Sequence, residues 1–394
     1  MSKTKRAINI EYCAVQALYW SGFCVCGSFA AVFLKSRGFS NAQLGLVMAA
    51  GNILGFFLSP LLASYVDRVK RRGLFACCIT LLAAELALVL SFYIVKAPLF
   101  VAIGYCVYMA CVTCVNPMNT QLCFTLEEQY GHINYGAARS TGSLAYAPVS
   151  LMMGTLVENL GANILLAAAG VLILLQGSLL LFIYNQSKGA DAAEGSVRAD
   201  TEQSSSLPRF IVDNKLFCLL LVGMSLLFFS HNLICSFMIN LAENVGGSTS
   251  HMGGINGFMA FVEIPAMVLY DRISHRFKCA SLMRFAVVMF VFKALAYAMA
   301  RSVAGLYAAC LAQALSFALL TPACVHYVNL MIAHKDSAKG QSLALGAITM
   351  GNVLACSIGG VLYDSYSVFT VLVFGVGIAA LGAAISLFSI KSKK

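Results

Sequence analysis

Apolar stretches long enough to cross a membrane follow one another along almost the whole of this 394-residue chain. A helix needs about 20 apolar residues to cross the roughly 30 Å of hydrocarbon in a bilayer. Twelve such stretches lie at about residues 10–34, 42–66, 74–95, 98–124, 138–158, 162–184, 215–241, 253–270, 280–299, 303–332, 341–362 and 366–389. Because 60% of the residues are hydrophobic and 11% are charged, too little polar surface remains for a soluble protein of this length. We therefore expect an all-α integral membrane protein with twelve transmembrane helices.

The two halves of the chain carry matching segments at one constant spacing. The segment PLLASYVDRVKRR, which contains Asp67, corresponds to IPAMVLYDRISHR, which contains Asp271 and lies 204 positions later. Gly340 follows Gly136 at the same spacing of 204 positions, within a second pair of similar segments. Internal repeats of this kind are typical of solute transporters. The twelve helices are therefore expected to form two pseudo-symmetric six-helix bundles.

One extended polar segment separates the two halves. It runs from Asn185 to Phe210, is rich in Ser, Ala and charged residues, and has no apolar periodicity, which is typical of a solvated linker. We expect an N-terminal bundle at 1–184, a cytoplasmic linker at 185–212 and a C-terminal bundle at 213–394. The N-terminal stretch lacks a short apolar core with a cleavage site, so we expect it to be retained.

Lysine and arginine residues are distributed unevenly between the two sides of this expected topology. If both termini share one side, only Lys35, Arg37, Lys96 and Arg301 fall in loops on the other side. Cytoplasmic loops carry the excess of positive charge in membrane proteins, so we expect both termini to be cytoplasmic in a multi-pass protein of the cell membrane. This bias accounts for the net charge of +10, so the basic residues indicate a lipid bilayer as partner and no nucleic acid.

The 15 cysteines lie almost entirely inside the apolar stretches. Disulfides or a metal site are the alternatives to packing, but no CxxC is paired with a second CxxC or with spaced His residues. Buried Cys behaves as a small apolar residue, so we expect neither a metal nor a cofactor. The sequence also has no G-x-x-x-x-G-K-[ST] phosphate-binding loop, which argues against ATP as the energy source.

The duplication, the central linker and the basic loops after the second and eighth stretches resemble the major facilitator superfamily over the whole chain. The loop motif of that family is roughly G-x-L-A-D-R-x-G-R-K. Residues that match it are Asp67, Arg68, Arg71 and Arg72 in the first loop, and Asp271, Arg272 and Arg276 in the second. Ala63 and Lys70 stand where the family has glycines.

The resemblance implies that these loops act as a conformational latch, with Asp67, Arg68, Arg71, Asp271 and Arg272 as gating residues. A carboxylate at the end of a helix can accept hydrogen bonds from the first amides of a neighbouring helix and can pair with a nearby arginine. The alternative interpretation is that the loops only anchor the chain by the positive-inside bias.

The stretch YGAARSTGSLAYA, residues 135–147, is similar to the start of the fifth helix in the oligosaccharide:proton symporters and the phenylpropionate permease-like group. In lactose permease-like members the arginine of this stretch binds the sugar together with an acidic residue on the fourth helix. Arg139 matches that arginine, whereas Gln121 stands in place of the acidic residue, near Asn116 and Asn119. A neutral amide cannot form the bidentate charge pair. The resemblance implies these four residues as candidate substrate contacts, with an interfacial anchor as the alternative for Arg139.

The first apolar stretch adds an aromatic and amide cluster of Gln16, Tyr19 and Trp20. Such a cluster suits stacking against a sugar or an aromatic ring. A plain packing stripe of the helix explains the same three residues equally well.

Two charged residues lie deep in the C-terminal half, where an ionised group costs about 2.5–3.5 kcal/mol unless it is paired or hydrated. They are Glu263 in the eighth stretch and Lys293 in the ninth. Phenylpropionate permease-like members are similar in having a glutamate and an arginine at about this separation. The resemblance implies that Glu263 and Lys293 couple transport to a proton, which the carboxylate takes up when it exchanges its partner. A static charge pair between the two helices is the alternative.

Further polar residues inside the stretches are candidates for substrate contact. They are His231 and Asn232 in the seventh stretch and Gln313 in the tenth. Single amides and histidines also bridge helices without any ligand, with a stabilisation of about 0.6 kcal/mol. Glu85 lies inside the third stretch, and no role follows from its position.

These features together predict a secondary active transporter for a small polar or aromatic solute of the sugar, nucleoside or aromatic acid class. We expect alternating access with proton-coupled symport, a sodium gradient as the alternative driving force, a monomer and no enzymatic activity. An exporter of drugs or sugars is the alternative among transporters. A membrane enzyme would show clustered metal ligands or a nucleophile with its base, and a non-transporting sensor a sizeable soluble domain, and the sequence shows neither.

Overall fold

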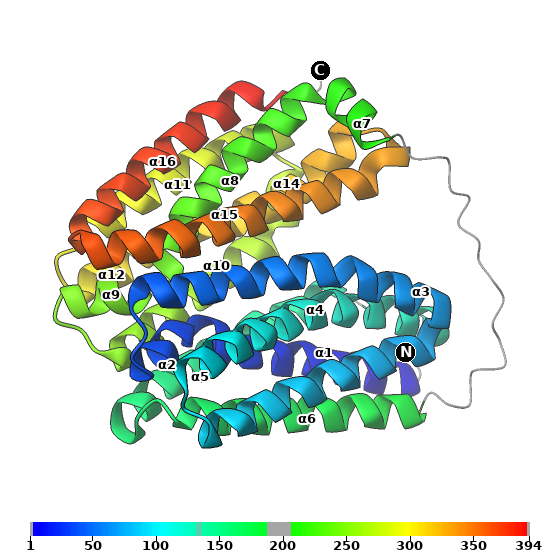
Figure 1. The fold of residues 1–394 in the computed structure, drawn as a ribbon. Coiled ribbons are helices and arrows are strands. Elements are labelled where there is room, and N and C mark those ends of the chain that lie inside the picture. The colour runs from blue at the N-terminus through cyan, green and yellow to red at the C-terminus, as the bar shows by residue number, and fades with distance from the viewer. Residues whose placement is uncertain (1–2, 132, 134, 187–205, 392–394) are drawn as a thin grey trace. The chain divides into compact units, whose positions relative to one another are not determined.

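The computed structural model describes residues 3–131, 133, 135–186 and 206–391, and these residues form helices joined by short turns (Figure 1). The helices of the N-terminal half are α1 (Lys3–Phe23), the π-helical turn η1 (Cys24–Ser28), α2 (Ala30–Ser36), α3 (Asn41–Ile94), α4 (Pro98–Tyr130), α5 (Tyr135–Leu160) and α6 (Ile164–Gln186). Those that follow are α7 (Leu207–Asp213), α8 (Lys215–Cys235), α9 (Met238–Asn244), α10 (Thr249–Ser274), α11 (Cys279–Met299), α12 (Val303–Cys310), α13 (Ala312–Leu315), α14 (Phe317–Met331), the short turn η3 (His334–Asp336), α15 (Ser337–Ser365) and α16 (Val368–Ser389).

The expected membrane spans are present. Within the described residues, ten helical segments are long and apolar enough to cross a bilayer, and a bent pair at 6–28 and 30–36 makes an eleventh. Two of the ten, 41–66 and 71–94, are successive legs of α3, which run in opposite directions in Figure 1. The more polar α5, with 26 residues, is also long enough to cross. These findings confirm the all-α membrane fold.

The described chain groups into two compact units, Met1–Gly195 with Ser248–Ala260 and Ser196–Gly247 with Phe261–Lys394. We call them the first and second unit. The expected boundaries, 1–184 and 213–394, stay a prediction. Much of the expected linker, 187–205, lies outside the described residues, while its last part contains all of α7 except Asp213.

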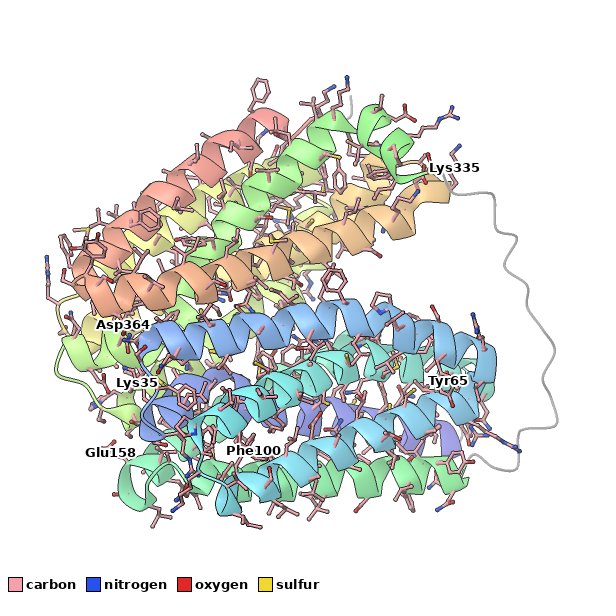
Figure 2. All side chains as sticks on the ribbon, viewed as in Figure 1. Lys35, Tyr65, Phe100, Glu158, Lys335 and Asp364 are labelled. Atoms are coloured by element: carbon pink, nitrogen blue, oxygen red, sulfur yellow. The ribbon has the colours of Figure 1, made fainter. Side chains whose placement is uncertain are left out.

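The first unit includes the start of α10, which α5 holds by direct contacts. Glu158, at one end of α5 (Figure 2), accepts hydrogen bonds from the hydroxyl of Ser248 (2.8 Å) and the amide of Ser250 (3.1 Å). A carboxylate at a helix N-terminus is favoured because it faces the unsatisfied amides of the first turn. The Ser150 hydroxyl donates to the carbonyl of Gly253 at 2.9 Å. Gly253 is required here, because a Cβ on it would collide with the backbone of α5.

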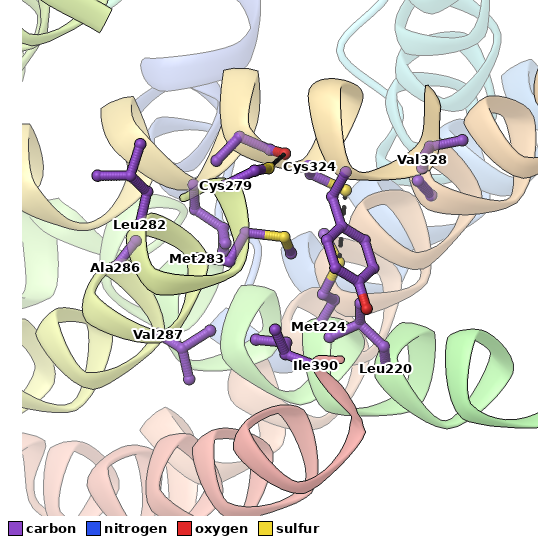
Figure 3. Packing of buried hydrophobic residues seen from close by; sticks show 14 of the residues in the cluster. Leu220, Met224, Cys279, Leu282, Met283, Ala286, Val287, Cys324, Val328 and Ile390 are labelled. Carbon is purple, nitrogen blue, oxygen red and sulfur yellow. Dashed lines mark hydrogen bonds between the residues drawn. The ribbon is translucent and has the colours of Figure 1, made fainter. Parts of the chain in front are cut away.

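The core of the second unit is built from apolar residues of α8, α11 and α14 (Figure 3). Leu220 and Met224 of α8 pack in one cluster with Met283 of α11 and Cys324 of α14. The Cys324 thiol lies 3.7 Å from the Met224 sulfur, so cysteine serves here as a packing residue. The 15 cysteines of the chain are free, and most of them are buried.

Three of the expected spans are interrupted instead of continuous. The first bends by 44° where η1 separates α1 from α2. The seventh breaks between α8 and α9, and the tenth is divided into α12, α13 and α14, with Ser316 at an irregular φ of −101° and ψ of −89°. Apolar length alone did not reveal these breaks. Interrupted helices in membrane proteins expose backbone groups and change the direction of side chains, and they are common at binding sites.

Candidate functional site

Four of the predicted site residues form a continuous hydrogen-bonded network in the second unit, although they come from four different helices. Lys293 of α11 donates to the side-chain oxygen of Gln313 in α13, and its Nζ lies 2.6 Å from Nδ1 of His231 in α8. The Gln313 Nε2 in turn donates to Oε1 of Glu263 in α10 at 2.5 Å. We call this chain of contacts the charged network. Glu263 and Lys293 are thus connected through Gln313, which sequence analysis had treated as a separate substrate contact.

The charged network has a buried end and a more open end. Lys293 and Gln313 are each 1% exposed, whereas Glu263 is half-buried. A single orientation of the Gln313 amide satisfies both neighbours, because its oxygen only accepts and its nitrogen only donates. A change in the charge of Glu263 therefore acts directly on the amide that also holds Lys293.

His231 terminates the network at its buried end. When Lys293 is an ammonium group it can only donate, and Nδ1 of a neutral His231 with its proton on Nε2 then accepts the hydrogen bond. The His231 ring stacks on Phe317 of α14 at a centroid distance of 5.0 Å. Phe228 and Phe290 meet it edge-on at 6.1 and 6.2 Å. Three rings therefore fix the imidazole and keep water from it on those sides.

The break in the tenth span explains how Gln313 reaches this position. Gln313 lies on the single turn α13, between the interruption after Cys310 and that at Ser316. The hydroxyl of Ser316 bonds back to the carbonyl of Ala312 at 2.7 Å, and such bonds compete with helix hydrogen bonds and bend the helix. The turn that carries the bridging amide is thus set apart from the straight helices around it.

A second cluster lies in the first unit, where Arg139 of α5 stacks on Trp20 of α1. The guanidinium carbon is 3.7 Å from the centroid of the indole ring, and Nη1 of Arg139 donates to the Ser143 hydroxyl at 3.3 Å. So close a contact over a ring suits the planar guanidinium better than an ammonium group. Gly142 permits it, because a Cβ at that position would collide with the indole. We call Arg139 and Trp20 the stacked pair.

Tyr12, Gln16 and Trp20 follow one another at a spacing of four residues and so lie on one face of α1. The Gln16 amide donates to the Tyr12 hydroxyl at 2.7 Å, and this hydroxyl donates to the carbonyl of Asn119 at 3.1 Å. The Tyr19 hydroxyl donates to the carbonyl of Val112 at 3.2 Å. Tyr12 was not predicted, although its spacing of four residues from Gln16 places it on the same face.

Several buried polar atoms of this cluster have no hydrogen-bond partner within the described chain. They are Oε1 of Gln16, Nε1 of Trp20, and both Oδ1 and Nδ2 of Asn119. Buried donors and acceptors are almost always satisfied in folded proteins, and each one left alone costs about 1–3 kcal/mol. The atoms include donors and acceptors, so their natural partner is a polar molecule with hydroxyl or amide groups, or water.

The remaining predicted contacts are placed differently. Asn232 donates to the Phe228 carbonyl of its own helix at 2.8 Å. Asn116 is half-buried on α4, and Gln121 is exposed. The structure places Arg139 against Trp20 on α1, a contact that the resemblance did not imply. Ser143 and Phe317 were missed, because no sequence pattern set them apart from other polar and aromatic residues in the spans.

The predicted gating residues are described only in part. The side chains of Asp67 and Asp271 lie outside the described residues, and those of Arg68 and Arg272 are exposed. Arg71 donates to the carbonyl of Tyr184 at 3.1 Å, with its guanidinium carbon 5.5 Å from the Tyr184 ring centroid. Arg71 therefore joins α3 to the end of α6.

Comparisons with known proteins agree with this architecture. A model described as the MFS_1 like family matches residues 10–376. The chain is 23% identical over 399 residues to the uncharacterized transporter YwbF of Bacillus subtilis (strain 168), covering 98% of this chain and 95% of the relative. It is 25% identical over 372 residues to the maltose permease of Geobacillus stearothermophilus, covering 92% and 90% of the two chains.

Solved structures show the same fold at low identity. A D323A mutant of the nucleoside transporter NupG superposes with a TM-score of 0.77 at 14% identity, covering 97% of this chain and 100% of that one. A bacterial homolog to the human lysosomal transporter Spinster, inward-facing and unoccupied, gives a TM-score of 0.72 at 12% identity, covering 99% and 97%.

Proposed function

Because the chain belongs to the MFS_1 like family of transporters, we propose that it carries a small polar or aromatic solute by alternating access, together with a proton. Relatives named as a maltose permease and a nucleoside transporter support the sugar and nucleoside classes. Aromatic acids remain within the proposal because a guanidinium suits a carboxylate.

The stacked pair and the unsatisfied polar atoms beside it are the proposed solute-binding surface of the first unit. The Trp20 indole is a flat face for a sugar or base ring, and Arg139 adds a planar set of donors. The unpartnered atoms of Gln16 and Asn119 could form hydrogen bonds to a hydroxylated solute that replaces water there. Tyr19, Asn116 and Gln121 are retained as weaker candidates on the same helices.

The charged network is the proposed coupling device of the second unit. With Glu263 ionised, the Gln313 amide donates to the carboxylate while its oxygen holds the Lys293 ammonium. A proton on Glu263 neutralises that carboxylate and weakens the hold on the amide, which frees Gln313, Lys293 and His231 to change partners. For Asn232, one position after His231, we propose only a structural role in α8.

One observation carries the proposal: an ammonium group that is 1% exposed reaches a half-buried carboxylate through a single bridging amide. A static pair would also hold the helices together, but the open side of Glu263 gives it a route for protonation that a fully buried pair lacks.

Transport by Glu263→Gln protein in liposomes tests the proposal. Maltose, uridine and phenylpropionate are first screened for binding, and radiolabelled solute is then followed with and without a proton gradient. We expect Glu263→Gln to exchange solute across the membrane but to lose gradient-driven accumulation, because glutamine cannot take up the proton. The matched control is Glu128→Gln, the same change at an exposed position, which should accumulate solute normally. Accumulation by Glu263→Gln with binding intact would exclude Glu263 as the coupling site.

We further propose, from the distribution of Lys and Arg, that the protein lies in the cell membrane as a monomer with both termini cytoplasmic. Asp67, Arg68, Arg71, Asp271 and Arg272 are the proposed gating residues on that side. Labelling of single introduced cysteines near each terminus, in intact cells and in inverted vesicles, tests the orientation. Termini labelled from outside intact cells would overturn it.

A further inference from the structure

A second carboxyl group is buried in the first unit, far along the chain from the charged network. Glu85 lies on the second leg of α3 and is 4% exposed. Its Oε1 has no hydrogen-bond partner within the described residues. Nothing in the proposed coupling mechanism uses this residue.

Glu85 faces a small internal cavity that also contains the side chain of Gln176 from α6. Tyr19, Cys26 and Tyr108 line the same cavity. About 20 Å³ is open to the centre of a water molecule, which is enough for one water. Gln176 is also 4% exposed, and its Nε2 has no partner within the described chain. Two unsatisfied polar groups therefore border a space of the right size to hold a shared water.

Among the described residues, the groups that surround Glu85 carry no positive charge. From the packed elements they are Tyr19 of α1, Cys26 of η1, Tyr108, Cys111 and Cys114 of α4, and Gln176 of α6. Arg139 acts electrostatically on Tyr19, and its guanidinium contacts Trp20 and Ser143. An ionised carboxylate in this setting would carry its full desolvation cost. A neutral carboxylic acid would instead donate a hydrogen bond into the cavity.

We propose that this cavity is a second proton-binding site, in which Glu85 is a neutral carboxylic acid that shares one water molecule with Gln176. The carboxyl O–H of Glu85 donates a hydrogen bond to the water oxygen. The Nε2 of Gln176 donates a second hydrogen bond to the same water. The site belongs to the first unit and is independent of Glu263. It therefore binds a proton whether or not the transport cycle is coupled through the charged network.

A protonated Glu85 makes the stability of the folded protein depend on pH. In an unfolded chain an ordinary glutamate loses its proton near pH 4, whereas the folded protein keeps this one. Folding then takes up a proton at neutral pH, so the free energy of unfolding falls as pH rises above about 4. Glu85→Gln carries an uncharged amide of similar shape and escapes that loss. Its melting temperature should exceed that of the natural protein at pH 8, and the difference should narrow towards pH 5.

Infrared spectroscopy of the purified protein in nanodiscs, without solute or gradient, tests the site directly. We expect the carbonyl stretch of a protonated carboxyl at pH 7 in the natural protein and in Glu263→Gln, and its loss in Glu85→Gln. Gln176→Leu should keep the band but shift its frequency, because the hydrogen-bonded water loses a partner. This variant also serves if Glu85→Gln does not fold.

The result that would overturn the proposal is the absence of a protonated-carboxyl band at pH 7 in Glu263→Gln, which retains Glu85. A band that persists unchanged in Glu85→Gln, or is unmoved in Gln176→Leu, would overturn it as well. Because no transport is measured, failure here leaves the coupling role of Glu263 untouched, and failure of that role leaves this site untouched.

Discussion

At the scale of single residues, the cluster in the first unit is built on contacts between planar groups, and the cluster in the second unit on charged groups. The guanidinium carbon of Arg139 lies 3.7 Å from the centroid of the Trp20 ring, a contact for which a lysine has no equivalent planar group. In the second unit, Lys293 occupies the place for which the resemblance suggested an arginine, and it binds two different partners, Gln313 and His231. A compact ammonium group with three donors suits that arrangement.

Replacing Arg139 tests the stacked pair. Arg139→Ala should weaken solute binding by about 5- to 30-fold, which corresponds to about 1–2 kcal/mol for a desolvated cation–π contact. The solute affinity of Arg139→Lys should lie between those of the natural protein and Arg139→Ala, because lysine keeps the charge but lacks the planar guanidinium. Titration calorimetry with the solute found in the screen measures both.

The control is Arg301→Ala, since Arg301 also stacks on a ring, that of Phe369 at 4.8 Å, but belongs to neither cluster. Affinity unchanged in Arg139→Ala for every solute of the panel would remove Arg139 from the binding surface.

At the scale of helices, apolar length and spacing predicted the spans because each span must cross the bilayer on its own. The breaks were not predictable in this way, because they depend on packing between distant segments. The seventh and tenth spans read as continuous apolar runs, yet α8 ends at Cys235 and α13 forms a separate turn around Gln313. Glu263 and Lys293 were identified from the cost of burying charge, whereas the amide between them carries no charge and gave no such signal.

Helix packing also predicts which glycines are needed for stability. Gly142→Ala should lower the melting temperature, at a cost of about 1–3 kcal/mol for overpacking, because its Cβ would collide with the Trp20 indole. It should weaken solute binding too, since the indole must move.

The matched control is Gly377→Ala in α16, where a Cβ would meet no atom within 4 Å. That change should be neutral or slightly stabilising, because alanine is the better helix former. Equal melting temperatures for Gly142→Ala and the natural protein would show that the indole does not need this close approach.

At the scale of the whole molecule, binding of solute and proton must be linked if the protein is a symporter. Each ligand then raises affinity for the other by the same factor. A solute that binds the folded protein raises its melting temperature, so the shift should be larger at pH 6 than at pH 8 in the natural protein. In Glu263→Gln the solute should raise the melting temperature by the same amount at pH 6 and at pH 8.

An exporter that exchanges solute for protons would show the opposite sign, with the larger shift at pH 8. Lipophilic cations added to the panel test that alternative among substrates. A shift equal at both pH values in the natural protein would contradict proton coupling altogether.

The stacked pair and the charged network each lie wholly within one unit. If the two proposed roles hold, the half that recognises the solute is separate from the half that takes up the proton. Substitutions on α1 and α5 can therefore alter which solute is accepted while the driving ion stays the same. With this division, changes in one half alone would be enough to accept a new solute, both in evolution and in a library that randomises the same few positions.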